Sequence, residues 1–577
     1  MSPTKLILPL GLILALSACA TPPATAPVAT GPAPTITPLD ADASPYGLFL
    51  AGRAALDEGR TADASAYLGR AAAAEGGPSF LTQRAFTAAL LSGDIAKAAA
   101  LAPDGDDAEP PAKRLGVLVR GVDDMAQGKN KEAYALLSGP DAGYPHKAAA
   151  ALLAPWAAAG AGDMIAATVR PTLGGDAIAQ FVGNLDQAQL FERAGKYDQA
   201  DASFKMLMTA GDAGGLVSGA YGAFLERRGR WNDAVTLYQD ALARMPGDPQ
   251  LIAGAARAKK HGRAPALAPL RQGAADALTI PAAGMMAQKQ EDIALAYLRL
   301  ALRLDPTRDE AWVLVGDLLA QSDDQDGARA AYAHARPGSE PYVTARSKLA
   351  WSYENADDHD TALKLAQATA AAAPESRDAA VTLADLLRAN DRYEESAAVL
   401  DKLIDQPGAT PEWRLYFMRA SAYEEAGEWP KAEADLQAAL KLSPDEPDLL
   451  NFLGYSWIDR GEHLKEALAM VQKAVDAEPQ SGAMIDSLGW GYYRLGDYKM
   501  AVEKLEQAVT LEAADPDVNN HLGDAYWRVG RKTEAQFQWR RVLSLDPDDK
   551  LKAAVEAKLA SPLGPDAPPA PSSVAAK

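Results

Sequence analysis

The chain has 577 residues, a formal net charge of −20 and one cysteine. This acidic balance argues against a nucleic-acid-binding protein, which needs Lys and Arg clustered on one face. A single cysteine excludes both an intramolecular disulfide and a cysteine-based zinc site. The two compact basic runs, Arg227–Arg230 and Lys259–Arg263, are interpreted as solvated helix ends.

The first residues have the pattern of a targeting signal. Lys5 precedes an apolar run, Leu6–Leu16, of about eleven residues, too short to span a bilayer as a permanent helix. The run ends in Leu-Ser-Ala-Cys at residues 16–19, which resembles the lipobox of bacterial lipoproteins. The alternative is an ordinary secretory signal with an incidental cysteine.

The lipobox resemblance implies removal of residues 1–18 and attachment of lipid to Cys19. Two or more acyl chains hold a protein on a membrane stably, where one alone does not. Ala20 stands where an Asp often signals inner-membrane retention in such lipoproteins, so we expect the outer membrane, with the chain facing the periplasm.

Residues 19–45 form the predicted tether. This segment is rich in proline and has no hydrophobic period, so it cannot bury a core. At about 3.1 Å per residue it could extend roughly 80 Å from the lipid. At the other end, residues 548–577 are expected to form a terminal helix and a disordered tail.

The part between these ends is repetitive. Small residues recur every 34 to 36 positions, with one break of 60 residues between Ala234 and Ala294, and prolines close several of the units. The recurring small residues are Ala200, Ala234, Ala294, Ala328, Ala362, Ser396, Ala432, Ala467, Ala501 and Ala535. A period near 34 residues predicts stacked helix pairs, a helical solenoid.

The pattern inside each unit resembles the tetratricopeptide repeat family. Residues 485–513 supply Leu488-Gly489, Tyr492, Gly496 and Ala501 at the family's positions. The resemblance implies an all-α, right-handed superhelical solenoid of about thirteen units. We expect one array at residues 46–245, an irregular shortened unit at 246–290, and a second array at 291–547.

No catalytic, cofactor or metal pattern accompanies these repeats. The six histidines lack metal-ligand spacing, and neither a phosphate-binding loop nor a Gly-x-Ser-x-Gly motif occurs. Carboxylate pairs such as Asp357–Asp358 are predicted in turns or on outer helical faces, and His521 is predicted to be packed or partly exposed within the repeat framework. We therefore expect a protein that is not an enzyme.

A solenoid offers a binding surface instead. In the repeat family, set positions of each first helix line a concave groove, and aromatic and Arg side chains are enriched in binding hot spots. The alternative is packing on the adjacent helix; outward-facing anchors are the prediction preferred here. The predicted protein-binding groove consists of Asn451, Tyr455, Asp486, Trp490, Tyr493, Arg494, Asn520, Asp524, Trp527 and Arg528.

Residues 451–547 are similar to the last units of a proteobacterial family of outer-membrane repeat lipoproteins. That resemblance implies an adaptor that presents cell-wall hydrolases to a periplasmic carboxyl-terminal processing protease. The alternative is an assembly factor, pilotin-like or accessory, of an envelope secretion or polysaccharide export machine. Both interpretations imply protein partners and a lipid anchor, with no nucleic acid.

Overall fold

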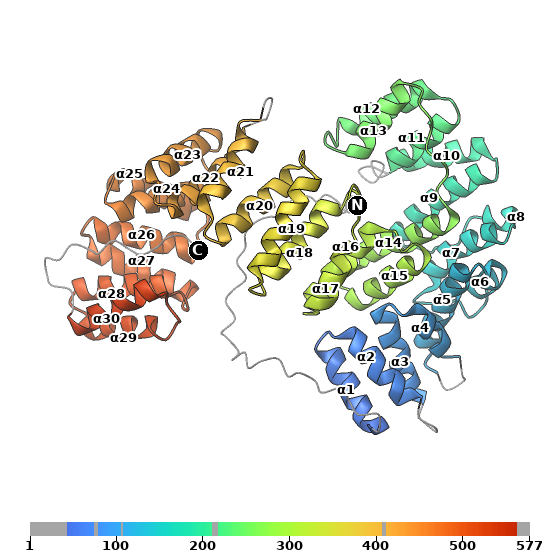
Figure 1. Ribbon diagram of the computed structural model, residues 1–577, viewed down its shortest axis with the longest axis horizontal. Helices are drawn as coiled ribbons and strands as arrows, with labels where there is room; N and C mark the ends of the chain where they lie inside the picture. The colour runs from blue at the N-terminus through green and yellow to red at the C-terminus, as the bar shows by residue number, and fades with distance from the viewer. Residues whose placement is uncertain (1–42, 74–78, 105–107, 210–216, 407–410, 562–577) are drawn as a thin grey trace, which may run out of the picture. The chain divides into compact units, whose positions relative to one another are not determined.

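The computed structural model describes residues 43–73, 79–104, 108–209, 217–406 and 411–561 (Figure 1). The predicted signal peptide, Cys19, most of the tether and the tail from residue 562 onward lie outside these residues. The described residues form thirty helices and no strand, which confirms the all-α prediction.

The described helices fall into two compact units, divided between residues 352 and 353 within α18. The predicted irregular segment, residues 246–290, does not mark this division, since it lies inside the first unit. The helices of the first unit are α1 (Pro45–Asp57), α2 (Thr61–Ala72), α3 (Ser79–Ser92), α4 (Ile95–Leu101), α5 (Pro110–Gln127), α6 (Asn130–Leu137), α7 (Lys147–Gly160), α8 (Met164–Ala167), α9 (Ala177–Arg193), α10 (Tyr197–Met208), α11 (Ser218–Arg227), α12 (Trp231–Leu242), α13 (Pro249–Lys259), α14 (Leu270–Ala287), α15 (Glu291–Leu304), α16 (Asp309–Gln321), α17 (Gln325–Tyr332) and most of α18 (Tyr342–Glu354).

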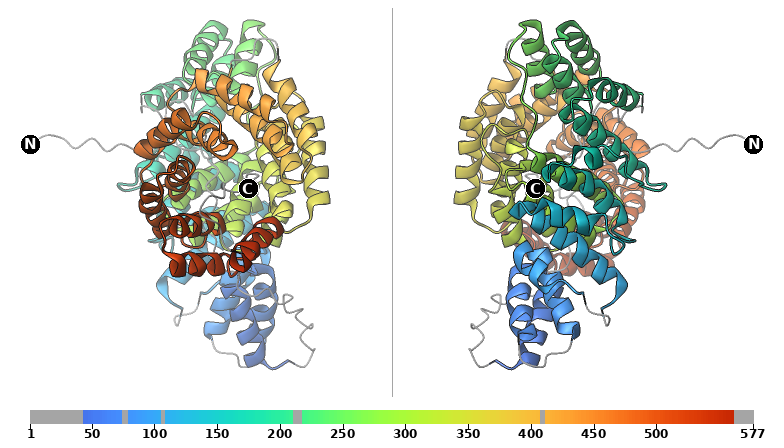
Figure 2. Two further views of the ribbon diagram at one scale, coloured as in Figure 1. Left: turned by 90° about the vertical axis from the view of Figure 1, so that its left-hand side faces the viewer. Right: turned by 90° about the vertical axis from the view of Figure 1, so that its right-hand side faces the viewer.

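The second unit is a succession of helix pairs. Figure 2 shows its orange-to-red helices following one another along a curve. Its helices are α19 (His359–Ala372), α20 (Arg377–Ala389), α21 (Tyr393–Ile404), α22 (Trp413–Glu425), α23 (Trp429–Leu442), α24 (Pro447–Arg460), α25 (Leu464–Ala477), α26 (Gly482–Arg494), α27 (Tyr498–Leu511), α28 (Pro516–Arg528), α29 (Lys532–Val542) and α30 (Asp549–Ala560).

Within a pair, the chain turns from the first helix to the second through two residues whose roles recur from unit to unit. The first has a positive φ, as Gly496 at 84° and Asp357 at 59°. The second caps the next helix: the carboxylate of Asp497 accepts a hydrogen bond from the Met500 N–H at 3.1 Å. Glycine adopts the left-handed conformation without steric cost, and aspartate tolerates it better than most residues. The predicted turn position of Asp357–Asp358 is therefore confirmed.

Small residues let the paired helices approach closely. A Cβ added to Gly523 in α28 would lie 2.6 Å from Trp539 of α29, and one added to Gly489 would lie 2.7 Å from Leu505. Ala501, at the matching position of α27, is fully buried. The small-against-large packing expected of this repeat therefore forms the core of each pair.

The first unit departs from a simple stack, because α15 packs against α3, α4 and α5 as well as its sequence neighbours (Figure 1). The Arg303 guanidinium lies 2.7 Å from Asp123, 180 residues earlier. His146 Nδ1 lies 3.0 Å from the Tyr297 hydroxyl, across 151 residues. Long-range contacts of this kind were not expected from a repeat in which each unit touches only its neighbours.

The irregular segment, residues 246–290, contains α13 and α14, but α14 pairs with α15 and not with α13. A Cβ added to Gly254 of α13 would lie 2.7 Å from the Tyr238 ring. A Cβ added to Gly222 of α11 would lie 2.3 Å from the same ring. Thus α13 packs on α12 as the first helix of a new unit. Residues 262–269 then run without helix to α14, so the second helix of that unit is missing.

Candidate protein-binding site

The predicted groove residues lie on α24, α26 and α28, the first helices of three consecutive pairs. These helices and the start of α30 enclose a cavity of about 420 Å³, called the acidic cavity below. Of the ten predicted groove residues, Asn451, Tyr455 and Asp486 line it. The structure therefore brings part of the predicted set around one hollow and places the rest elsewhere.

Trp490 and Tyr493 do not face outward, so their predicted exposure is wrong. They are 1% and 2% exposed. The two rings stack with centroids 4.7 Å apart, and Trp490 stacks on His521 of α28 at 4.2 Å. These rings fill the space between successive first helices. Stacking removes their large apolar faces from water, which favours packing over exposure.

Asn520 and Asp524 are covered by α30, the last helix that the structure describes. Lys558 of α30 donates hydrogen bonds to Asn520 at 2.7 Å and to Asp524 at 2.9 Å. Asp524 also accepts a hydrogen bond from the Trp539 indole N–H at 3.0 Å. With both side chains buried, their predicted exposure in a binding groove is also wrong.

Arg494 and Arg528 brace one repeat against the preceding one. Arg494 donates to the backbone carbonyl of Asp459 at 2.7 Å, and Arg528 donates to the Tyr493 hydroxyl at 3.2 Å. Trp527 is half-buried, with its ring 5.5 Å from that of Trp539. Both arginines are thus engaged within the solenoid.

A similar brace occurs in the first unit. Arg227, interpreted from the sequence as a solvated helix end, donates to buried Glu192 at 2.7 and 2.8 Å. Arg257 of α13 likewise donates twice to Glu226 of α11. This role was not predicted from the sequence, although Glu192 and Arg227 are spaced by 35 residues, as are Asp459 and Arg494.

His521 forms a buried pair with Asp486, beside the acidic cavity. Its Nδ1 lies 2.9 Å from Asp486 Oδ2, and the side chain is 1% exposed. Burial alone would lower the pKa of His521, but the carboxylate of Asp486 outweighs it and raises the pKa to about 8. The prediction of a packed histidine is confirmed, while its ionic partner 35 residues away was not foreseen.

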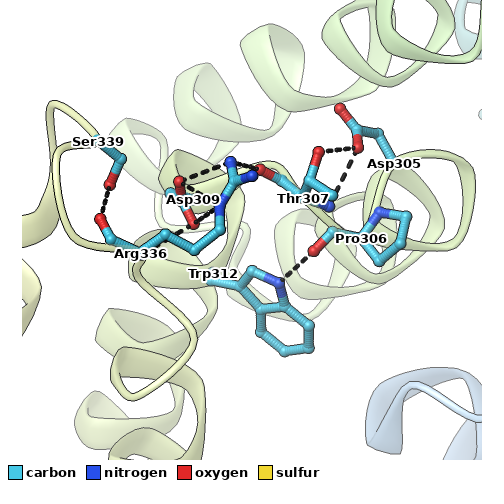
Figure 3. Close-up of polar contacts among 7 residues, drawn as sticks. All are labelled: Asp305, Pro306, Thr307, Asp309, Trp312, Arg336 and Ser339. Carbon is cyan, nitrogen blue, oxygen red and sulfur yellow. Dashed lines mark hydrogen bonds and ion pairs between the residues drawn. The ribbon is translucent and has the colours of Figure 1, made fainter.

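A second cavity, of about 460 Å³, lies in the first unit among α13, α14, α16 and the loop after α17. Figure 3 shows the Arg336 guanidinium on the Asp309 carboxylate, at 2.9 Å, and on the Thr307 carbonyl, at 2.6 Å. The Asp305 side chain accepts hydrogen bonds from Thr307. These groups pair with one another, so the second cavity has fewer unpaired polar side chains than the acidic cavity.

The described ranges hold neither a metal-binding cluster nor a helix suited to cross a membrane. No group of three or more His, Cys, Asp or Glu side chains there is arranged to hold a metal ion. No helix in the same ranges combines the length and apolar character needed to cross a bilayer.

Family models recognise repeats in both units. A model described as "Tetratricopeptide repeat" matches residues 185–249, 347–411 and 417–482. One described as "TPR repeat" matches residues 491–530, and another "Tetratricopeptide repeat" model matches residues 516–549.

Curated relatives share only part of their length with this chain. "TPR repeat-containing protein PA4667" of Pseudomonas aeruginosa is 30% identical over 221 residues, which is 37% of this chain and 36% of that protein. "Bacteriophage adsorption protein A" of Escherichia coli K12 is 25% identical over 148 residues, 24% of this chain and 15% of that protein.

Solved structures resemble the chain at low identity. The "APC/C hetero-tetramer Cut9-Hcn1" crystal structure covers 90% of this chain and 97% of its own, at 15% identity and a TM-score of 0.38. A "thermophilic TPR protein" of Thermus thermophilus covers 32% of this chain and 100% of its own, at 21% identity and a TM-score of 0.28. Over residues 185–249, 347–411, 417–482 and 491–549 the chain therefore carries repeats that match tetratricopeptide repeat models.

Proposed function

We propose that this protein is a non-catalytic scaffold that binds other proteins at the periplasmic face of the outer membrane. The observation that carries the binding role is the acidic cavity, open among three successive first helices and lined by polar side chains. Pockets that bind small molecules in proteins are hollows of about 300–1,000 Å³ with a few convergent polar groups, a size that can also receive a side chain of a partner. The acidic cavity falls in this range.

The anchor and the partner rest on the sequence. We propose that lipid on Cys19 holds the chain to the membrane and that the Pro-rich tether lets the repeats reach away from it. The partner proposed is a carboxyl-terminal processing protease, with cell-wall hydrolases presented to it as substrates. This part follows from the resemblance of residues 451–547 to adaptor lipoproteins.

The anchor is tested with Cys19→Ser. We expect this variant to leave the outer-membrane fraction, either as soluble periplasmic protein or as unprocessed precursor at the inner membrane, and to lose the lipid mass. A variant that still fractionates with the outer membrane would contradict the anchor.

The partner is tested by affinity capture of the wild-type chain from detergent-solubilised envelope, followed by mass spectrometry. Enrichment of a carboxyl-terminal processing protease together with cell-wall hydrolases is the expected result. Enrichment of secretion or polysaccharide-export components in their place would replace the adaptor with the assembly-factor role. Recovery of no envelope protein would overturn the scaffold itself.

A further inference from the structure

The acidic cavity carries a large excess of negative charge. Seven of its nineteen lining residues are Asp or Glu, against one arginine and one histidine. That arginine, Arg460, already donates to Glu424 at 2.8 Å, and the histidine, His521, already pairs with Asp486. Of the other carboxylates, Asp459 lies 3.9 Å from Arg494 and Glu512 accepts a hydrogen bond from the Ala483 N–H at 3.0 Å. The cavity keeps an excess of negative charge all the same.

Asp517 is the clearest case. Its carboxylate makes no hydrogen bond or ion pair with any residue that the structure describes, although the side chain is half-buried at the cavity wall. Burial raises the pKa of Asp517 to about 6; nearby His521 opposes this rise, and Asp515, Asp486 and Asp548 add to it. A cation in the cavity would give this carboxylate a positively charged partner.

Two polar atoms of residues that line the cavity point to a peptide as the carrier of that cation. His521 Nε2 is buried and has no hydrogen-bond partner, and the same is true of Asn451 Oδ1. With His521 Nδ1 bonded to Asp486, the protonated ring has an N–H to donate at Nε2, whereas the Asn451 oxygen can only accept. An extended backbone offers both complements, a carbonyl and an N–H.

We propose that the acidic cavity binds an extended segment of a partner protein through a Lys or Arg side chain held by Asp517 and Glu512. The partner's backbone carbonyl accepts from His521, and its N–H donates to Asn451. This inference rests on the proposed scaffold function and adds the chemistry of the segment that the scaffold recognises. Charge-assisted hydrogen bonds to buried carboxylates are among the stronger polar contacts in proteins.

The test measures binding of two labelled octapeptides to the detergent-solubilised full chain by fluorescence anisotropy. One peptide alternates lysine with alanine, and the other alternates glutamate with alanine. We expect the lysine peptide to bind, the glutamate peptide not to bind, and the affinity to fall when salt rises from about 50 to about 300 mM.

The decisive comparison is between two charge-matched double variants. Asp517→Asn with Glu512→Gln removes two cavity carboxylates without changing side-chain size. Glu394→Gln with Glu556→Gln removes two exposed ones of the same unit. The first pair should weaken binding of the lysine peptide by about tenfold or more, and the second by less than about twofold. Circular dichroism melts of all variants check that the fold persists.

Three outcomes would overturn the inference: no binding of the lysine peptide, equal binding of both peptides, or equal losses in the two double variants. The scaffold proposal fails separately, in the envelope capture. If the cavity variant recovers the same envelope proteins as wild type, the scaffold stands and the basic-segment inference is wrong. If it loses one protein that the control variant retains, that protein is expected to present a Lys- or Arg-bearing segment.

Discussion

Lys558, in the last helix, lies 2.8 Å from the carboxylate of Asp524, the side chain that the repeat pattern assigns to a binding groove. Asp524 is 3% exposed, and Lys558 also donates to Asn520. The terminal helix α30 thus occupies the place that a partner would take on α28. It caps the last repeat that the structure describes, the pair α28 and α29.

Replacing Lys558 with alanine should destabilise the end of the second unit by about 3–5 kcal/mol, because it leaves a buried carboxylate without its counter-charge. Hydrogen exchange should speed up in α28 to α30. Lys552→Ala, an exposed lysine of the same helix, is the matched control and should change little. Similar exchange in the two variants would show that α30 is held by its apolar contacts alone.

Trp490→Ala should destabilise the repeats around it by about 3–5 kcal/mol, because it empties a core position between α26 and α28. A melting curve and hydrogen exchange of α26 to α28 measure the loss. The control is Phe537→Ala on α29, where the ring is 63% exposed. An unchanged melting temperature for Trp490→Ala would contradict the core position of this side chain and favour its prediction as a groove residue.

Local features of the fold were predictable because they repeat in the sequence. The turn before α27 needs Gly496 in the left-handed conformation and Asp497 as a cap, and both recur in other units with the same period. Gly489 against Leu505 likewise follows from residues spaced within one repeat. These features depend on contacts within about 35 residues, the range that a periodic pattern records.

Some features that the sequence did not predict depend on contacts outside that period. The pairing of Arg303 with Asp123, across 180 residues, has no repeat spacing to mark it. Lys558 follows Asp524 by 34 residues, one repeat period, but its contact was missed because residues 548–577 were expected to lie beyond the repeats. The outward exposure of Trp490 was predicted wrongly for a related reason. Its position on α26 fits groove or core equally well, and the presence of His521 on α28 decides in favour of the core.

The buried pair of His521 and Asp486 makes the stability of α26 to α28 depend on pH. The folded state holds the pKa of His521 at about 8, above the ordinary value of 6.5. The stabilisation is therefore fully present below about pH 6.5 and is lost as pH rises through about 8, by about 2 kcal/mol in total. Hydrogen exchange of these helices from about pH 6 to 9, corrected for intrinsic rates, measures the loss.

His521→Gln is the control for this dependence, since it removes the titrating group. At about pH 6 its protection from hydrogen exchange should be lower than that of wild type. Between about pH 6 and 9 its protection should not show the fall that wild type shows. Parallel pH profiles for the two proteins would mean that another group is responsible.

The two units should respond differently to the same core mutation. In the first unit, α15 contacts α3, α4 and α5, and Arg299 donates to the Leu91 carbonyl at 3.0 Å across 208 residues. In the second, α27 packs on α26 and α28, its neighbours in sequence. Leu298→Ala in α15 and Leu505→Ala in α27 remove the same group from fully buried positions, each at a cost of about 2–5 kcal/mol.

Hydrogen exchange along the chain should separate the two cases. Leu298→Ala should speed exchange in α14 to α16 and also in α3 to α5, about 200 residues earlier in the sequence. Leu505→Ala should speed exchange in α24 to α30 and leave α20 and α21 unchanged, because in a stack of repeats each unit mainly supports its neighbours. If the effect of Leu298→Ala stops at α14 to α16, the long-range contacts add little to stability, and both units behave as simple linear arrays.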